Sequence, residues 1–237
     1  DLGVLTSACA YAFSSASYSS SASVLLGNGD GSFAARVDCA LPHGANSVVL
    51  GDVDGDGDLD IVTSSYSYSS SYYSYSSSAS VLLGNGDGSF AARVDYDLPR
   101  GANSVALGDV DGDGDLDIVS SSSSSASVLL GNGDGSFAAW VDYALPRGTN
   151  SVALGDVDGD GDLDIVTGND NSASVLFGNG DGSFAARVEY ALPDALSVAL
   201  GDVDGDGDLD IVTGNGSSAS VLLNRLRWLL SGHRTIC

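Results

Sequence analysis

Apolar and polar residues alternate along most of the chain, in short runs that return with nearly the same letters. In residues 104–110, SVALGDV, apolar and small residues alternate up to an aspartate-rich loop, and DLDIVS follows at 115–120. SASVLLG at 125–131 and FAAWVDYALP at 137–146 complete the set. A period of two predicts β-strands, and no window shows a convincing helical period of 3.6 residues. Each unit is therefore expected to hold four strands.

These sequence segments form a repeat. An apolar triplet beginning Val-Leu recurs at Val24, Val81, Val128, Val175 and Val221, at spacings of 57, 47, 47 and 46 residues. The GNGDGS segment between the third and fourth runs is a strong hairpin signal, because Asn-Gly and Asp-Gly tolerate positive φ. Four antiparallel strands per unit of about 47 residues predict an all-β, β-propeller-like array of about five blades. An open β solenoid is the alternative.

The repeat also predicts the organisation of the chain, with incomplete units at both ends. The first unit lacks its first strand and the aspartate-rich loop, and the last lacks a recognisable fourth strand. The expected segments are an incomplete first blade at 1–42, blades at 43–99, 100–146, 147–193 and 194–223, and a non-repeat tail at 224–237.

The aspartate-rich loop has the chemistry of a cation site. In GDVDGDGDLDIVT (51–63), carboxylates stand at loop positions 1, 3, 5, 7 and 9, and a glycine at position 6 permits a sharp turn. Oxygen ligands without His or Cys favour Ca²⁺ over Zn²⁺ or copper. Position 12 is Thr63 and not a bidentate Glu, so the loop is not an EF-hand. The predicted metal residues are Asp52, Asp54, Asp56, Asp58, Asp60, Asp109, Asp111, Asp113, Asp115, Asp117, Asp156, Asp158, Asp160, Asp162, Asp164, Asp202, Asp204, Asp206, Asp208 and Asp210.

The alternation of GDVDGDGDLDIVT with SVLLGNGDGSF resembles the FG-GAP/VCBS repeat family, which includes the calcium-binding blades of integrin α-subunit propellers. The resemblance covers residues 1–223. It implies a propeller whose blades hold Ca²⁺ in the hairpin between their first and second strands, with those aspartates as ligands. Integrin propellers have seven blades, whereas this chain offers about five. About four ions are expected, because the first blade has no metal loop.

Composition narrows the possible partners. The formal net charge is −24, all eight basic residues are Arg, and 43% of residues are hydrophobic. Such a surface repels nucleic acid and favours cations or basic partners. No apolar stretch approaches the ~20 residues of a membrane span. The chain starts at Asp1 without a visible signal peptide, as a processed mature chain or a fragment would.

The cysteines and hydroxyl-rich segments leave alternatives open. A Cys9–Cys39 disulfide would brace the incomplete first blade, and the alternatives are free thiols or a bond that uses Cys237. The Ser/Tyr run at 64–78 is expected to be a surface loop, either simply solvated or glycosylated. Asn215 lies in an N-G-S sequon of the last unit.

The tail RLRWLLSGHR alternates arginines with Leu226, Trp228 and Leu230. It could form a strand that pairs with a blade edge of its own chain or of a neighbour, or it could simply end the last blade.

Nothing in the chain specifies a catalytic centre, because neither His43 nor His233 lies near a nucleophilic motif. We therefore expect a non-enzymatic, extracellular calcium-binding module with a structural or adhesive role. Its unequal ends could assemble end to end into a homopolymer or fibre. The alternatives are a carbohydrate-binding propeller, for which Trp140 in place of an arginine is the one indication, and the non-catalytic part of a secreted enzyme. Glycans or an extracellular protein are the expected ligands.

Overall fold

A computed structural model describes residues 4–10, 19–69, 74–193 and 195–224. Within these residues the secondary structure is entirely β, with eighteen strands in five antiparallel sheets. None of the described residues forms a long apolar helix of the kind that crosses a membrane.

We number the sheets one to five along the chain. The first and last have three strands among the described residues, and the others have four. Sheet one contains β1 (Val4–Ala10), β2 (Ser19–Leu25) and β3 (Val37–Leu41). Sheet two contains β4 (Ala45–Gly51), β5 (Asp60–Ser69), β6 (Ser74–Leu82) and β7 (Val94–Asp97). Sheet three contains β8 (Ser104–Gly108), β9 (Asp117–Ser121), β10 (Ser125–Leu129) and β11 (Val141–Ala144). Sheet four contains β12 (Ser151–Gly155), β13 (Asp164–Asn169), β14 (Ser172–Leu176) and β15 (Val188–Ala191). Sheet five contains β16 (Ser197–Gly201), β17 (Asp210–Gly214) and β18 (Ala219–Leu222).

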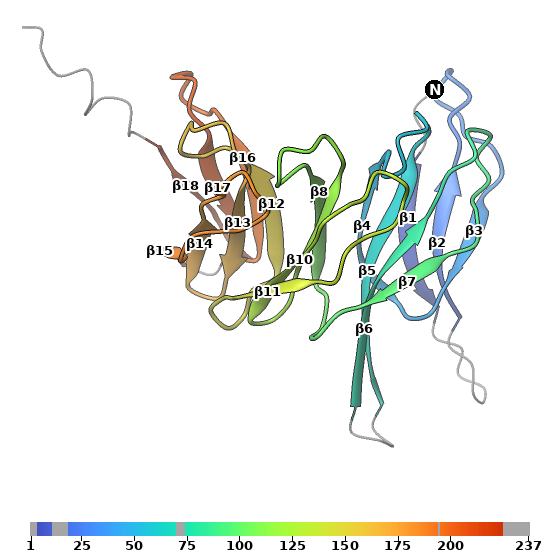
Figure 1. Ribbon diagram of the computed structural model, residues 1–237, viewed down its shortest axis with the longest axis horizontal. Helices are drawn as coiled ribbons and strands as arrows, with labels where there is room; N and C mark the ends of the chain where they lie inside the picture. Colours follow the sequence, from blue (N-terminus) through green and yellow to red (C-terminus); the bar gives the residue numbers. More distant parts are fainter. Residues whose placement is uncertain (1–3, 11–18, 70–73, 194, 225–237) are drawn as a thin grey trace, which may run out of the picture.

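The sheets stand side by side in an open array. The strands β1, β4, β8, β12 and β16 contact one another in succession. Figure 1 shows sheets one and five at opposite ends of the longest axis, with sheets two to four between them. The prediction of an all-β, propeller-like array of antiparallel sheets is therefore confirmed.

The hydrophobic core lies between neighbouring sheets. Both central strands of sheet three, β9 and β10, are buried along their whole length, because sheets two and four cover their two faces. The fourth strand β11 is largely exposed. An aromatic pair recurs at the sheet interfaces: Tyr96 packs edge-to-face on Phe137 of the next sheet at 5.4 Å, and Tyr143 does the same with Phe184 at 5.3 Å. Such pairs add to the free energy of apolar burial.

Glycines allow the sheets to approach closely. A Cβ at Gly155, the last residue of β12, would lie 2.8 Å from Leu200 Cδ1 in β16 and 2.9 Å from Leu209 Cδ1 in the loop that connects β16 to β17. Gly51 and Gly108 face leucine pairs of their following sheets in the same way. Around Gly201, at the end of β16, a Cβ would meet no atom within 4 Å. The repeated glycine therefore leaves the space that leucine side chains of the following unit occupy.

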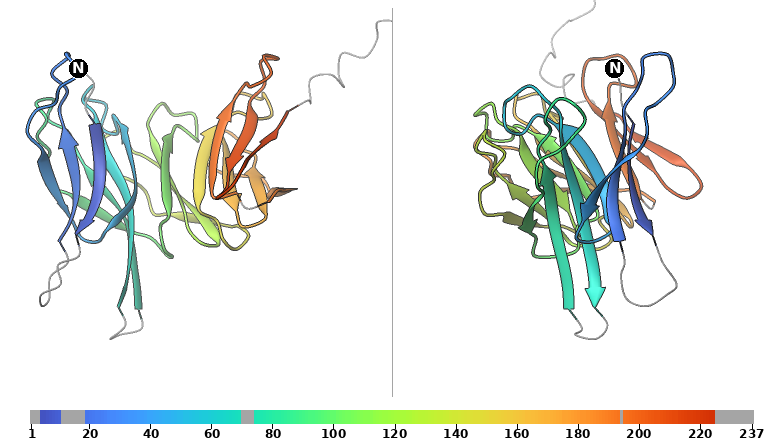
Figure 2. Two further views of the ribbon diagram at one scale, coloured as in Figure 1. Left: turned by 180° about the vertical axis from the view of Figure 1, so that it is seen from behind. Right: turned by 90° about the vertical axis from the view of Figure 1, so that its right-hand side faces the viewer.

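The described residues of the Ser/Tyr run, 64–69 and 74–78, do not form the surface loop expected from the sequence. They prolong β5 and β6 into a two-stranded ribbon, paired in register from Ser64 and Ala79 out to Ser69 and Ser74. Figures 1 and 2 show this ribbon projecting beyond the body of the array. Alternating serine and tyrosine satisfy a period-two pattern, and tyrosine favours strands, so the segment continues the hairpin.

The structure also argues against the Cys9–Cys39 disulfide. Cys9 lies in β1 opposite Ser20, while Cys39 lies in β3 opposite Ala22. Strand β2 separates them, so their Cα atoms are roughly 10 Å or more apart, whereas a disulfide requires less than about 7 Å. Cys39 has a free thiol, and Cys237 lies outside the described residues.

Two other predictions concern the last unit. Asn215 Oδ1 accepts the Ser217 and Ser218 N–H groups at 2.9 and 2.7 Å, so the sequon forms the turn between β17 and β18. Its glycosylation stays a prediction. The strand predicted in the tail lies outside the described residues, which end at Asn224.

Candidate metal centre

The aspartate-rich loops connect the first and second strands of sheets two to five, all on one edge of the array (Figure 1). In sheet two, β4 ends at Gly51 and β5 begins at Asp60. Gly55 and Gly57 have φ of 74° and 93°, which L side chains rarely adopt, so glycine at these positions permits the tight coil. Successive aspartates can then turn their carboxylates toward one centre.

The ninth loop position holds each loop to its own sheet. Asp60 is fully buried, and its Oδ2 accepts the Val53 N–H at 2.7 Å while Oδ1 accepts the Gly84 N–H at 2.7 Å. The carboxylate thereby joins the loop to the segment after β6. The same two bonds recur at Asp117, Asp164 and Asp210.

The first position shapes the loop from within. Asp52 Oδ1 accepts the Gly55 N–H at 2.8 Å, and its Oδ2 accepts the Gly57 N–H at 2.9 Å. Asp109, Asp156 and Asp202 repeat this pair of bonds in their loops. The loop conformation is thus built by its own carboxylates and glycine amides.

The structure brings together three of the five predicted aspartates in each loop. In three loops, carboxylate oxygens from positions 1, 3 and 9 lie within 4.8 Å of one another. In the last loop, the convergent positions are 1, 3 and 5. The four groups are Asp52, Asp54 and Asp60; Asp109, Asp111 and Asp117; Asp156, Asp158 and Asp164; and Asp202, Asp204 and Asp206.

The remaining predicted ligands of the first three loops have other contacts. Asp56 Oδ1 accepts the Asp58 N–H at 2.8 Å, as Asp113 and Asp160 do for Asp115 and Asp162. The Asp58 carboxylate lies against Gly86 in the hairpin of its own sheet, where a Cβ would come within 2.7 Å of both its oxygens. Asp115 and Asp162 lie against Gly133 and Gly180 in the same way. Their part in metal binding stays a prediction.

In three of the loops, the buried carboxylate at position 9 has a raised pKa and is therefore harder to ionise than a free aspartate. The pKa of Asp117 is raised to about 6, chiefly by burial and to a smaller extent by the nearby carboxylates of Asp111 and Asp113, while its two backbone hydrogen bonds oppose the rise. Burial likewise raises the pKa of Asp60 and of Asp164. A divalent cation among the carboxylates would favour the ionised form. The oxygen-only donor set fits Ca²⁺, which takes six to eight oxygens in flexible geometry.

Comparisons with known proteins agree with this architecture. The family model of the FG-GAP-like repeat matches residues 11–63, 69–120, 109–167 and 156–213. No curated protein matches the chain. Among solved structures, an Agrocybe aegerita lectin that recognises non-reducing terminal N-acetylglucosamine has 20% identity and a TM-score of 0.53, over 93% of this chain and 66% of the lectin.

A Photorhabdus luminescens Tc holotoxin pore has 18% identity and a TM-score of 0.40, over 86% of this chain and 13% of the toxin chain. The chain therefore spans less than two thirds of either protein, and the lectin likeness concerns the fold alone. Because the repeat model covers most of the chain in four successive matches, the protein belongs to the FG-GAP-like repeat family.

Proposed function

We propose that the protein is a calcium-stabilised, non-catalytic module that acts outside the cell in a structural or adhesive role. The observation that carries the proposal is the fourfold convergence of three carboxylates within 4.8 Å. Without a cation, the mutual repulsion of these carboxylates opposes folding. With one, the binding free energy adds to the stability of the folded array.

The location follows from the expected affinity. Sites of moderate affinity fill at extracellular calcium concentrations and remain largely empty in the cytosol. At a free Ca²⁺ concentration of about 100 times Kd, each site would add about 2.7 kcal/mol to the free energy of unfolding.

Calorimetry tests the proposal directly. Protein stripped with EGTA is titrated with Ca²⁺ and, separately, with Mg²⁺, and its melting temperature is measured at each concentration. We expect about four Ca²⁺ per chain, a melting temperature that rises with Ca²⁺, and a much weaker response to Mg²⁺. No uptake of Ca²⁺ and an unchanged melting temperature would contradict the proposal.

We further propose that the module assembles end to end. Sheets one and five each have three strands among the described residues, which leaves one side of β1 and one side of β18 without a strand partner there. Free strand edges favour pairing with another chain, and a contact between unlike ends propagates into a fibre. Electron microscopy in Ca²⁺ should show filaments that EGTA dissolves, whereas monomers in both conditions would refute assembly.

A further inference from the structure

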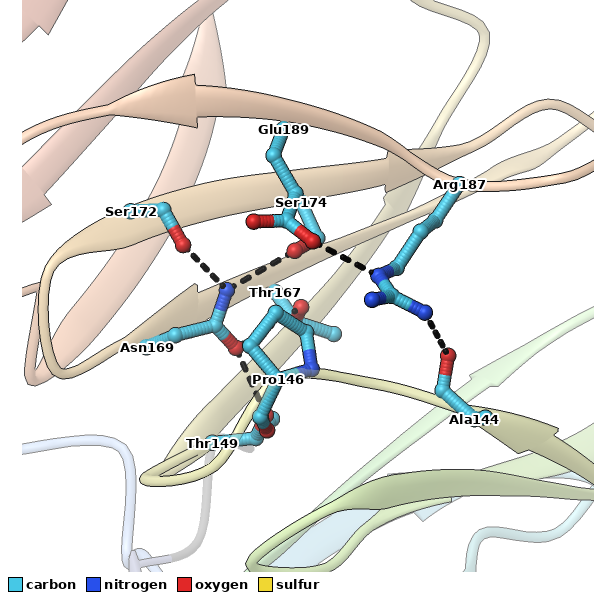
Figure 3. Close-up of polar contacts among 9 residues, drawn as sticks. All are labelled: Ala144, Pro146, Thr149, Thr167, Asn169, Ser172, Ser174, Arg187 and Glu189. Atoms are coloured by element: carbon cyan, nitrogen blue, oxygen red, sulfur yellow. Dashed lines mark hydrogen bonds and ion pairs between the residues drawn. The ribbon is translucent and has the colours of Figure 1, made fainter.

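In sheets two and four, an arginine just before the fourth strand hydrogen-bonds to the preceding sheet. Arg187, just before β15, donates from Nε to Glu189 at 2.8 Å and from Nη1 to the Ala144 carbonyl of sheet three at 3.2 Å (Figure 3). Arg93, just before β7, donates from Nη1 to the Ala40 carbonyl of sheet one at 2.7 Å. Each guanidinium therefore links its own sheet to the preceding one.

Between sheets two and three this bridge is missing, because the equivalent residue is Trp140. Its side chain is 42% exposed and has no guanidinium to reach across. Asp142 holds the position of Glu189 and accepts a hydrogen bond from Ser127 at 2.9 Å, but it has no ion pair with any described residue. The substitution therefore leaves both an open groove and a carboxylate without a cation.

A cavity of about 750 Å³ occupies this position. Trp140 and Asp142 line it from sheet three, and Tyr66 and Arg100 line it from sheet two and the segment after it. The matching cavity at the next interface, lined by Pro146, Arg147 and Glu189, has a volume of about 380 Å³. The volume of the larger one is in the range of small-molecule sites.

The lining combines aromatic faces with hydrogen-bonding groups of both kinds. Tyr66 is 43% exposed, and its ring lies against Gly101, where a Cβ would be 3.5 Å from the ring Cγ. Arg100 offers guanidinium donors and has no ion pair among the described residues, while Asp142 offers acceptors. Ser123 contributes a hydroxyl-bearing side chain to the lining.

We propose that this cavity binds a pyranose sugar of a glycan. The C–H face of a pyranose ring packs on an aromatic ring, and its hydroxyls both donate and accept hydrogen bonds. Trp140 and Tyr66 supply the apolar surface, and Asp142 and Arg100 supply the acceptor and the donor. A purely apolar ligand would leave both charges unsatisfied, whereas a polyanion would be repelled by the net charge of −24.

The test uses the repeat itself to supply the variant. W140R places at the site the residue that the neighbouring sheets carry, so the variant should fold and keep the calcium-dependent melting temperature of the parent. Both proteins are applied to a glycan array in Ca²⁺. Dissociation constants for methyl glycosides of the sugars that bind are then measured for both proteins by isothermal titration calorimetry.

We expect the parent to bind glycans that share one pyranose sugar, and W140R to bind them at least tenfold more weakly. D142N should also weaken binding, while the reverse change R187W keeps the parent's affinity. Absence of any glycan bound by the parent, or equal binding by W140R, overturns the proposal. The melting temperatures separate this result from the calcium proposal, because they respond to Ca²⁺ whether or not a sugar binds.

Discussion

The aromatic pair between sheets gives a sharp test of how the array is held together. Phe184 and Phe33 lie in the same heptapeptide, GSFAARV, so an alanine at either position changes the same local sequence. Phe184 is 9% exposed and packs on Tyr143 of the preceding sheet, whereas Phe33 is 44% exposed and precedes the last strand of sheet one. The two positions therefore differ in tertiary packing alone.

We expect F184A to lower the free energy of unfolding by about 3–5 kcal/mol, the usual cost of removing a buried phenylalanine. About 0.5–1.5 kcal/mol of this is the edge-to-face contact with Tyr143, so F184L should lose less than F184A. F33A should cost about 1 kcal/mol or less, within the range of partly exposed substitutions.

Urea unfolding in saturating Ca²⁺, followed by circular dichroism and tryptophan fluorescence, measures these differences. Coincidence of the two signals checks that the array unfolds cooperatively, since repeat arrays can lose cooperativity. Equal losses for F33A and F184A would show that the phenylalanine acts within its own hairpin, and would refute the packing argument.

The other predictions follow from the glycine contacts and the acidic loops. G155A forces a methyl group to within 3 Å of Leu200 and Leu209 and should cost about 1–3 kcal/mol in urea unfolding, while G201A, with open space around it, should be neutral. Without Ca²⁺, the raised pKa of Asp117 means that the folded state holds its proton more tightly than the unfolded state. Its contribution is therefore present at low pH and lost between about pH 4 and pH 6, which thermal unfolding in EGTA can follow. Calcium affinity should rise over the same interval, because the ion requires the ionised carboxylate, and a titration that is flat between pH 4.5 and 7 would contradict both expectations.

The repeated sequence segments predict the sheets well because the interactions that form each sheet lie within one repeat unit. Alternating apolar residues, Asn-Gly turns and the Asp-Gly coil all act within one unit, and the eighteen strands follow them. The convergence of positions 1 and 3 of each loop is local too, as the Asp52 bonds to Gly55 and Gly57 show. The ligand pattern could therefore be recognised before any fold was known.

The sequence is less informative where contacts between different strands or loops determine the position of a side chain. The position of Cys39 depends on β2 lying between β1 and β3, which the spacing of cysteines does not express. The direction of the Asp58 carboxylate, whose part in metal binding stays a prediction, likewise depends on Gly86, 28 residues further along the chain. No local sequence pattern singles out Tyr66, Arg100 or Asp142. The replacement of a repeated arginine by Trp140 is the sequence feature that indicates their interface.

The four acidic loops differ in how the following sheet covers them, and this predicts unequal calcium sites. In the loop of sheet two, Val53 is 2% exposed and its carbonyl accepts the Gly135 N–H of sheet three at 3.1 Å. Val110 is also 2% exposed and accepts from Gly182 of sheet four at 3.1 Å. In the loop of sheet five, Val203 is 53% exposed.

A following sheet fixes the loop before the ion arrives, so less conformational entropy is lost on binding. We therefore expect three tighter sites and one weaker site in a calorimetric titration. The weaker class should disappear in D202A, whereas D156A should remove one of the tighter sites. These two aspartates make the same pair of bonds to glycine amides in their own loops. Their loops differ in the covering sheet and in the third convergent carboxylate, which is Asp164 in one loop and Asp206 in the other. Four sites of equal affinity, or loss of a tight site in D202A, would show that the loops bind independently of their neighbours.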